Sequence, residues 1–141
     1  MPRIYTKAGD DGTTGLLYGG RISKAHPAAE AYGSVDEAVA ALGLARSLSS
    51  STEVAALILR LERELFVVGA DLATNPDERD KLAPGVSLVT ADMAMSLEEI
   101  IDRTVAEHPL PQQFIVPGAT AASGVSPAAL RTASTPSDDT R

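Results

Sequence analysis

The sequence predicts an all-α protein, an up-down helical bundle preceded by an irregular, glycine-rich N-terminal loop. Three segments repeat apolar residues at spacings of three and four, the period of an amphipathic helix. No segment shows the strict alternation of apolar and polar residues typical of a half-buried strand. The chain has 141 residues, of which 44% are hydrophobic, so it has the length and composition of one globular domain. With three tyrosines, two phenylalanines and no tryptophan, its core must be aliphatic.

The first helix is expected over residues 26–48, where Pro27 suits the first turn. The second is expected over residues 53–73 and has the most continuous apolar stripe in the chain. Thr52 precedes this stripe and is expected to cap the second helix, because threonine hydroxyls accept hydrogen bonds from free N–H groups.

A third helix is expected over residues 91–108, after Thr90 as N-cap and before two prolines that stop it. Residues 75–85 between the second and third helices are expected to be a charged loop. Three helices leave broad apolar faces, so the bundle is expected to need a partner or further helices.

The composition argues against several classes of function. The net charge of −7 argues against a nucleic-acid surface. The chain has no cysteine, so it can form neither a disulfide nor a thiolate metal site. His26 and His108 are isolated, so no metal site built from protein ligands is assigned. No apolar run approaches the ~20 residues of a membrane span, and the N-terminus lacks a signal-peptide layout. We therefore expect a cytoplasmic protein without a membrane partner.

The stretch Ile4–Gly15 holds three glycines, three threonines and two adjacent aspartates. Such clusters usually form ordinary turns. They can also surround a polar ligand, because glycines allow close backbone approach and free N–H groups bind anions. The aspartates then require a divalent cation or basic partners, for which Lys7, Arg21 and Lys24 are candidates. The stretch is neither a Walker A loop nor an EF-hand.

Five motifs together resemble the PduO-type ATP:cob(I)alamin adenosyltransferases, also called corrinoid adenosyltransferases. They keep the order and spacing of that family over about residues 3–123, and they are Tyr5–Leu16, Gly19–Lys24, Glu30–Glu37, Glu64–Ala73 and Phe114–Gly118. Any one of them would be weak, but the combination is specific, and it favours the ligand-binding interpretation of the N-terminal loop over the plain turn.

The resemblance implies a five-helix bundle of which only the first three helices are clear here, assembled as a homotrimer with ATP between subunits. It implies transfer of the 5′-deoxyadenosyl group of ATP to the cobalt of cob(I)alamin, giving adenosylcobalamin and tripolyphosphate, with Mg²⁺ bound to the ATP. It also implies a set of ATP-binding residues: Thr6, Lys7, Ala8, Gly9, Asp10, Asp11, Gly12, Thr13, Thr14 and Lys24. No residue is assigned a catalytic acid or base role, because cob(I)alamin is itself a strong nucleophile.

Two further residues receive roles from the resemblance. Phe114 would face the lower side of the corrin and keep water or dimethylbenzimidazole from the cobalt; without the resemblance, it is a core aromatic near a turn. Asp36 would pair with an arginine of a neighbouring subunit; otherwise it is a solvated helix carboxylate. A flavin reductase or an adenosylcobalamin-dependent enzyme is the implied protein partner.

After about residue 123 the sequence turns rich in proline, serine and threonine, and residues 124–141 are expected to be a disordered tail. We interpret the change as a truncation or frameshift that removes the two last helices of the family. Two alternatives to full activity therefore stay open: a non-catalytic remnant that binds ATP or corrinoid, and a helical-bundle interaction module.

Overall fold

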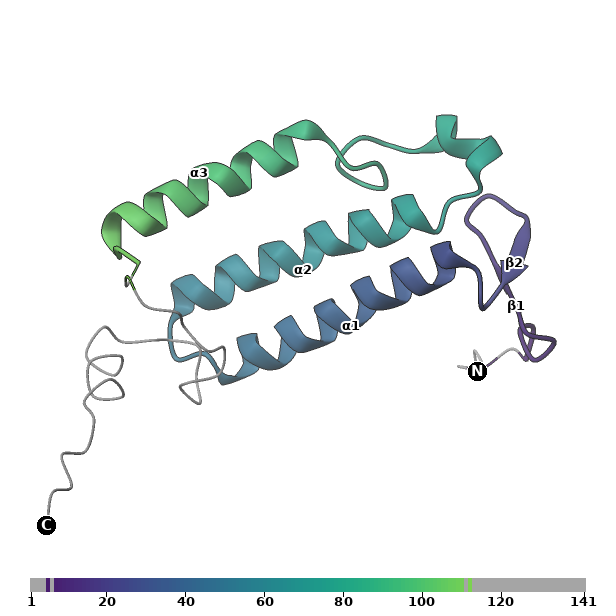
Figure 1. Ribbon diagram of the computed structural model, residues 1–141, viewed down its shortest axis with the longest axis horizontal. Coiled ribbons are helices and arrows are strands. Elements are labelled where there is room, and N and C mark those ends of the chain that lie inside the picture. The colour runs from purple at the N-terminus through teal and green to yellow at the C-terminus, as the bar shows by residue number, and fades with distance from the viewer. Residues whose placement is uncertain (1–4, 6, 111, 113–141) are drawn as a thin grey trace, which may run out of the picture.

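Helix α2, Thr52–Leu72, is the central element of the structure, with α1 (Pro27–Leu48) and α3 (Ala91–Glu107) on its two sides (Figure 1). The computed structural model describes residues 5, 7–110 and 112. Successive helices run up and down, which confirms the helical fold class. Each helix begins and ends within one residue of the range expected from the sequence.

The helix starts follow from local hydrogen bonding. His26 caps α1, since its Nδ1 accepts from the backbone N–H of Ala28 at 3.1 Å. Ser51 caps α2, since its hydroxyl accepts from Val54 N at 3.3 Å. The expectation that Thr52 would be this cap is wrong by one residue. The two residues have equivalent hydroxyls, and the cap is the one whose backbone is extended, which here is Ser51.

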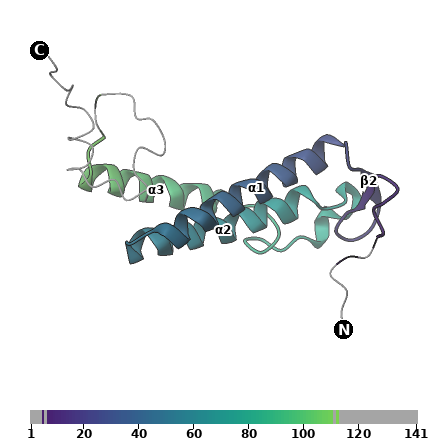
Figure 2. The same ribbon diagram turned by 90° about the horizontal axis from the view of Figure 1, so that it is seen from below.

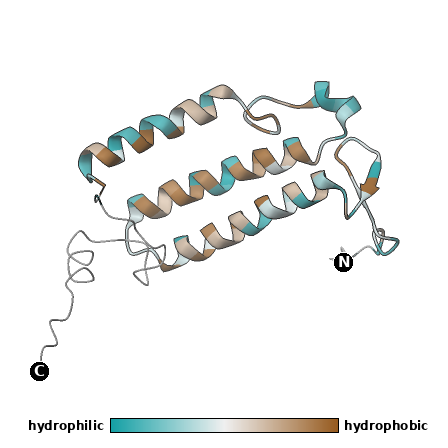
Figure 3. Ribbon diagram, viewed as in Figure 1, coloured by the Kyte–Doolittle hydropathy of each residue, from teal (hydrophilic) through white to brown (hydrophobic). Residues whose placement is uncertain are grey.

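The three helices form a single layer and do not close around a common core. Seen from below, they overlap in a narrow band (Figure 2). The apolar residues of α2 lie along most of its length (Figure 3), yet in the described part of the chain only Ile58, Val67 and Leu82 are buried apolar side chains. Large apolar side chains stay exposed on all three helices, among them Leu44, Leu48, Phe66, Met95 and Ile101.

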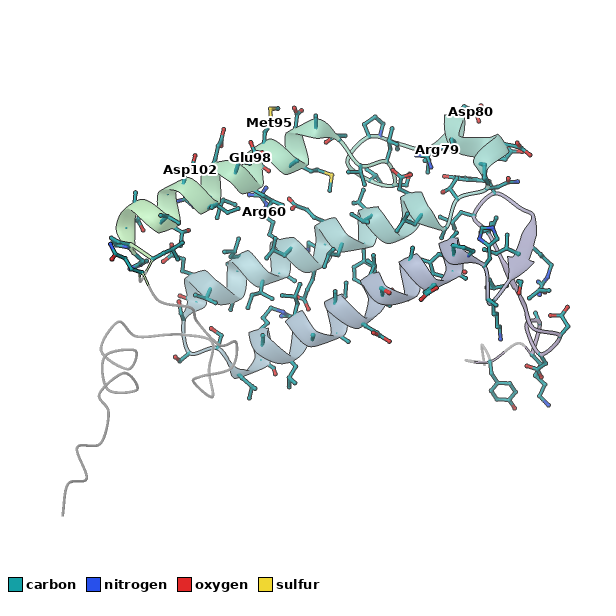
Figure 4. The ribbon with its side chains drawn as sticks, in the orientation of Figure 1. Arg60, Arg79, Asp80, Met95, Glu98 and Asp102 are labelled. Carbon is teal, nitrogen blue, oxygen red and sulfur yellow. The ribbon has the colours of Figure 1, made fainter. Side chains whose placement is uncertain are left out.

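Two charged contacts between helices supplement this thin core. Glu62 of α2 is only 7% exposed, and its Oε2 lies 2.7 Å from Arg46 Nε of α1. The N–H of Arg46 is not aimed at this oxygen as in a hydrogen bond, so the contact is an ion pair. On the other side, Arg60 points from α2 toward α3 (Figure 4) and donates to the hydroxyl oxygen of Ser96 on α3, while its Nε donates to Glu64 Oε1 on α2 itself at 2.8 Å.

The N-terminal region is more regular than the sequence predicts. Strands β1 (Thr13–Gly15) and β2 (Arg21–Ser23) pair antiparallel, with Thr14 opposite Ile22. The expectation of an irregular loop is wrong for these residues. Three-residue strands are too short to show alternation, and the connecting turn is made by Gly19 and Gly20, both at positive φ.

The connection from α2 to α3 is also partly ordered. Pro76–Lys81 form a short 3₁₀ helix, η1, where the sequence predicts a loop. The Asp71 carboxylate fixes this connection at two points: it pairs with Arg79 at 2.5 Å and accepts a hydrogen bond from Val89 N at 3.1 Å.

In the described residues no helix is both long and apolar enough to cross a membrane. Thr6, Phe114 and the tail expected at 124–141 lie outside the described residues.

Candidate functional site

The candidate site is the hairpin formed by residues 7–24, which lies at one end of the helical layer (Figure 1). Its connecting turn is bonded to the chain that leaves α2. Leu17 N donates to Ala73 O at 2.9 Å, and Asn75 N donates to Leu17 O at 3.1 Å. Tyr18 adds a bond from its hydroxyl to Lys81 O at 3.3 Å. One side of the hairpin is therefore held by α2 and η1.

The other side of the hairpin, residues 7–12, is shaped by its own turns. Asp10 N bonds Lys7 O at 3.3 Å, and Gly12 N bonds Gly9 O at 3.2 Å. Lys7 and Gly12 have φ values of 61° and 80°. Positive φ suits glycine and is uncommon for lysine, so the Lys7 conformation depends on the surrounding turns.

Asp11 organises the end of this loop. Its Oδ1 accepts from the Thr13 hydroxyl at 2.8 Å and from Thr13 N at 2.9 Å. These two bonds, the hydroxyl first, hold the pKa of Asp11 below its ordinary value, and the charge of Arg21 acts in the same direction. Asp11 therefore remains a carboxylate that shapes its own loop.

Arg21 reaches back from β2 to the same loop. Its Nη2 donates to Ala8 O at 2.6 Å, and its Nε donates to the Thr13 hydroxyl oxygen at 2.8 Å. The same Nη2 lies 3.6 Å from Asp11 Oδ1. Sequence reasoning offered Arg21 only as a basic neighbour of the loop and missed these contacts. In the sequence, only the presence of an arginine eight residues after Thr13 could have indicated these contacts.

Lys24 lies across Gly9. A Cβ added to Gly9 would meet Lys24 Cε and Nζ at 3.2 Å and Thr13 O at 2.8 Å. Glycine is therefore required at this position by close approach and not by positive φ. Within the described residues the Lys24 ammonium group forms no ion pair, although its backbone N–H bonds Gly12 O at 2.9 Å.

A backbone donor accompanies that ammonium group. In the part of the chain that the structure describes, the N–H group of Gly9 donates to no acceptor. Free N–H groups in a turn with a lysine beside them form an anion-binding arrangement. The hydroxyl of Thr13, by contrast, is already bonded within the hairpin to Asp11 and Arg21.

The hairpin thus brings together most of the residues that the resemblance assigns to ATP, namely Lys7, Ala8, Gly9, Asp10, Asp11, Gly12, Thr13, Thr14 and Lys24. Asp36 is separate: it is exposed on α1 and forms no ion pair with any described residue. No group of three His, Cys, Asp or Glu side chains that could hold a metal occurs among the described residues.

The chain belongs to the cobalamin adenosyltransferase family, whose family model matches residues 4–135. This match continues past residue 123, where the sequence analysis placed the end of the resemblance. A corrinoid adenosyltransferase of Citrobacter freundii is 36% identical over 123 residues, which cover 87% of this chain and 68% of that protein. One of Mycobacterium tuberculosis H37Rv is 36% identical over 119 residues, covering 84% of this chain and 61% of the relative.

A second Citrobacter freundii relative, corrinoid adenosyltransferase PduO, is longer: the chain is 37% identical to it and spans 33% of its length. Among solved structures, a variant PduO-type ATP:corrinoid adenosyltransferase from Lactobacillus reuteri, complexed with cobalamin and ATP, superimposes with a TM-score of 0.74. It is 31% identical, and the alignment covers 93% of this chain and 70% of that one. Another variant of the same enzyme, complexed with ATP, gives a TM-score of 0.68 at 33% identity, covering 82% and 63%.

Proposed function

We propose that this chain binds ATP at the hairpin of residues 7–24 and transfers its 5′-deoxyadenosyl group to the cobalt of cob(I)alamin. The observation that carries the proposal is the combination of the Gly9 N–H group with the Lys24 ammonium group, neither of which has a hydrogen-bond or ion-pair partner among the described residues. Family membership and the ATP and cobalamin complexes of the Lactobacillus reuteri relative support it.

The reaction requires that cobalt, C5′ and the leaving oxygen be aligned and that the negative charge on the leaving tripolyphosphate be stabilised. The electron pair of Co(I) forms the Co–C bond to C5′, the C5′–O bond breaks, and its electrons leave with tripolyphosphate. No proton has to be moved by the protein. Negative charge builds on the leaving oxygen, and fixed donors aimed at it stabilise the transition state. The Gly9 N–H group and Lys24 would supply such donors for the phosphate chain.

Mg²⁺ fits this site as a companion of ATP. It usually binds through one or two carboxylates together with phosphate oxygens. Asp11 is engaged by Thr13 and Arg21, while Asp10 is exposed and forms no ion pair among the described residues. Asp10 is therefore the loop carboxylate available to a phosphate-bound Mg²⁺.

The corrin and the subunit interface complete the proposal. Phe114 would cover the lower face of the corrin, and Thr6 would extend the ATP contacts. We propose a homotrimer with Asp36 at the interface: the number of subunits follows from the resemblance, and the large apolar side chains exposed on all three helices favour association. A flavin reductase is the proposed source of the electron that makes cob(I)alamin, and an adenosylcobalamin-dependent enzyme is the proposed recipient of the product.

The decisive experiment is titration with Mg²⁺ and ATP by calorimetry, followed by an anaerobic assay with cob(I)alamin. Lys24→Gln should raise the Kd for ATP about 10- to 100-fold, since a hydrogen bond to a charged group contributes about 1.5–3 kcal/mol. Arg103→Ala, which removes one exposed positive charge near the end of α3, is the matched control. If the chain bound ATP but transferred no adenosyl group, it would be a nucleotide-binding protein and the proposed reaction would be refuted. If it did not bind ATP, the whole proposal would be refuted.

A further inference from the structure

Arg21 extends from the anchored part of the hairpin and hydrogen-bonds the loop of residues 7–12 and the residue that follows it, Thr13. It belongs to β2, directly after the turn that is bonded to Ala73 and Asn75. Its guanidinium group contacts Ala8 O, the Thr13 hydroxyl and, at 3.6 Å, the Asp11 carboxylate. Ala8 and Asp11 lie in the loop, and Thr13 is the first residue of β1, directly after it.

The contacts match the fork geometry of a guanidinium group. Nε and Nη2 both reach the Thr13 hydroxyl oxygen, at 2.8 and 2.6 Å, while Nη2 also bonds Ala8 O. The Thr13 hydroxyl in turn donates to Asp11 Oδ1. Arg21, Thr13 and Asp11 therefore form one closed network, and the Gly9 N–H group lies on the segment between Ala8 and Thr13 that this network spans.

We propose that Arg21 is a positioning residue, which holds the Ala8–Thr13 loop in its nucleotide-binding shape through Ala8 O, Thr13 and Asp11. The inference rests on the proposed function for the identity of the nucleotide. If Arg21 has this positioning role, Asp11 also aids ATP binding, even though its charge has the same sign as that of the phosphates. A loop that keeps its binding-competent shape only one tenth of the time binds about tenfold more weakly.

The direction in which ATP affinity changes when the Asp11 carboxylate is removed distinguishes a positioning role of Arg21 from direct contact with phosphate. If Arg21 simply attracted phosphate, removing the neighbouring Asp11 carboxylate would tighten ATP binding, because a repulsive charge is lost. If Arg21 and Asp11 hold the loop together, Asp11→Ala weakens ATP binding. Arg21→Lys adds a second distinction, since lysine keeps the charge but lacks the planar fork.

The experiment compares the full chain with its Arg21→Ala, Arg21→Lys and Asp11→Ala variants and the Arg21→Ala/Asp11→Ala double variant. Arg103→Ala is the charge-matched control, since α3 ends at the opposite end of the molecule from the hairpin (Figure 1). We expect each of the three single variants at the network to raise the KM and Kd for Mg·ATP about tenfold and to leave kcat within about twofold. The double variant should be no worse than the worse single variant, because both remove one network.

Amide exchange without nucleotide provides the readout of loop order. Thr13 N bonds Asp11 Oδ1 and Lys24 N bonds Gly12 O, so both amides should exchange faster in Arg21→Ala. Unchanged exchange, tighter ATP binding in Asp11→Ala, or full rescue by Arg21→Lys would each overturn the inference. If the unsubstituted chain fails to bind ATP, the proposed function is lost, while the exchange rates still decide whether Arg21 orders the loop.

Discussion

The ion pair between Arg46 and Glu62 should stabilise the packing of α1 on α2 asymmetrically. The Glu62 side chain is 9% exposed, and that of Arg46 is 42% exposed. Gly43 makes room for the carboxylate, because a Cβ there would lie 3.0 Å from Glu62 Oε1. If Arg46 is removed, Glu62 is left charged between two helices. If Glu62 is neutralised, Arg46 can turn toward water.

The magnitudes follow from these exposures. Breaking a buried pair costs about 3–5 kcal/mol, whereas exposed pairs contribute about 0–1 kcal/mol. We expect Arg46→Met to lower the free energy of unfolding by about 2–3 kcal/mol and Glu62→Gln by about 1 kcal/mol. For a domain of this size the melting temperature falls by about 4 °C per kcal/mol, so losses of about 10 and 4 °C are expected.

Urea denaturation at one fixed protein concentration measures both losses, since oligomer stability depends on concentration. The double variant Arg46→Met/Glu62→Gln should be more stable than Arg46→Met alone, because no unpaired charge remains. Arg103→Met on α3 should change stability by no more than about 0.5 kcal/mol. Equal losses in the two single variants, with a coupling below about 0.5 kcal/mol, would refute the reasoning and assign the pair to the exposed class.

Three further changes test the hairpin and its anchor. Gly9→Ala should weaken ATP binding in calorimetry at least about tenfold, because its Cβ would meet Thr13 O at 2.8 Å, while Gly15→Ala, with nothing within 4 Å, is the control. Asp71→Ala should lower stability by about 1 kcal/mol and accelerate exchange of the Val89 amide, which loses its acceptor; unchanged exchange would contradict this. Because the folded pKa of Asp11 is lowered, its contribution to loop order is complete above about pH 4 and is lost as the pH falls through the lower folded value. The carboxyl resonance should therefore titrate at lower pH in the folded than in the urea-denatured chain, and an equal midpoint would contradict this.

The helices could be predicted because their signal is local and repeated. In α2 the apolar residues recur over twenty-one residues, so the period is unambiguous and the ends are placed within one residue. The hairpin could not be predicted in this way, since each strand has three residues and only one side chain in each, Thr14 and Ile22, forms the central pair. The choice of Ser51 over Thr52 as cap depends on a backbone angle that composition does not encode.

The candidate site was predictable as a set of residues but not as a structure. Lys24 and Gly9 are fifteen positions apart, and only the antiparallel pairing of β1 with β2 brings them together. Thr13 and Asp11 were expected to contact ATP, and in the structure their side chains bond each other. The burial of Glu62 was not predicted, because a glutamate in a helix is usually solvated.

The position of the hairpin depends on the end of α2, so the fold and the site are coupled through a few backbone bonds. Leu17 is bonded to Ala73 and Asn75, immediately after the last turn of α2, and Asp71 ties that turn to Arg79 and Val89. The core behind α2 is thin, and the ion pair between Arg46 and Glu62 supplements the packing of α2 on α1. Loosening α2 would therefore shift the anchor of the loop as well as lower stability. A ligand that orders the loop should in return stabilise α2, because coupling between two sites is reciprocal.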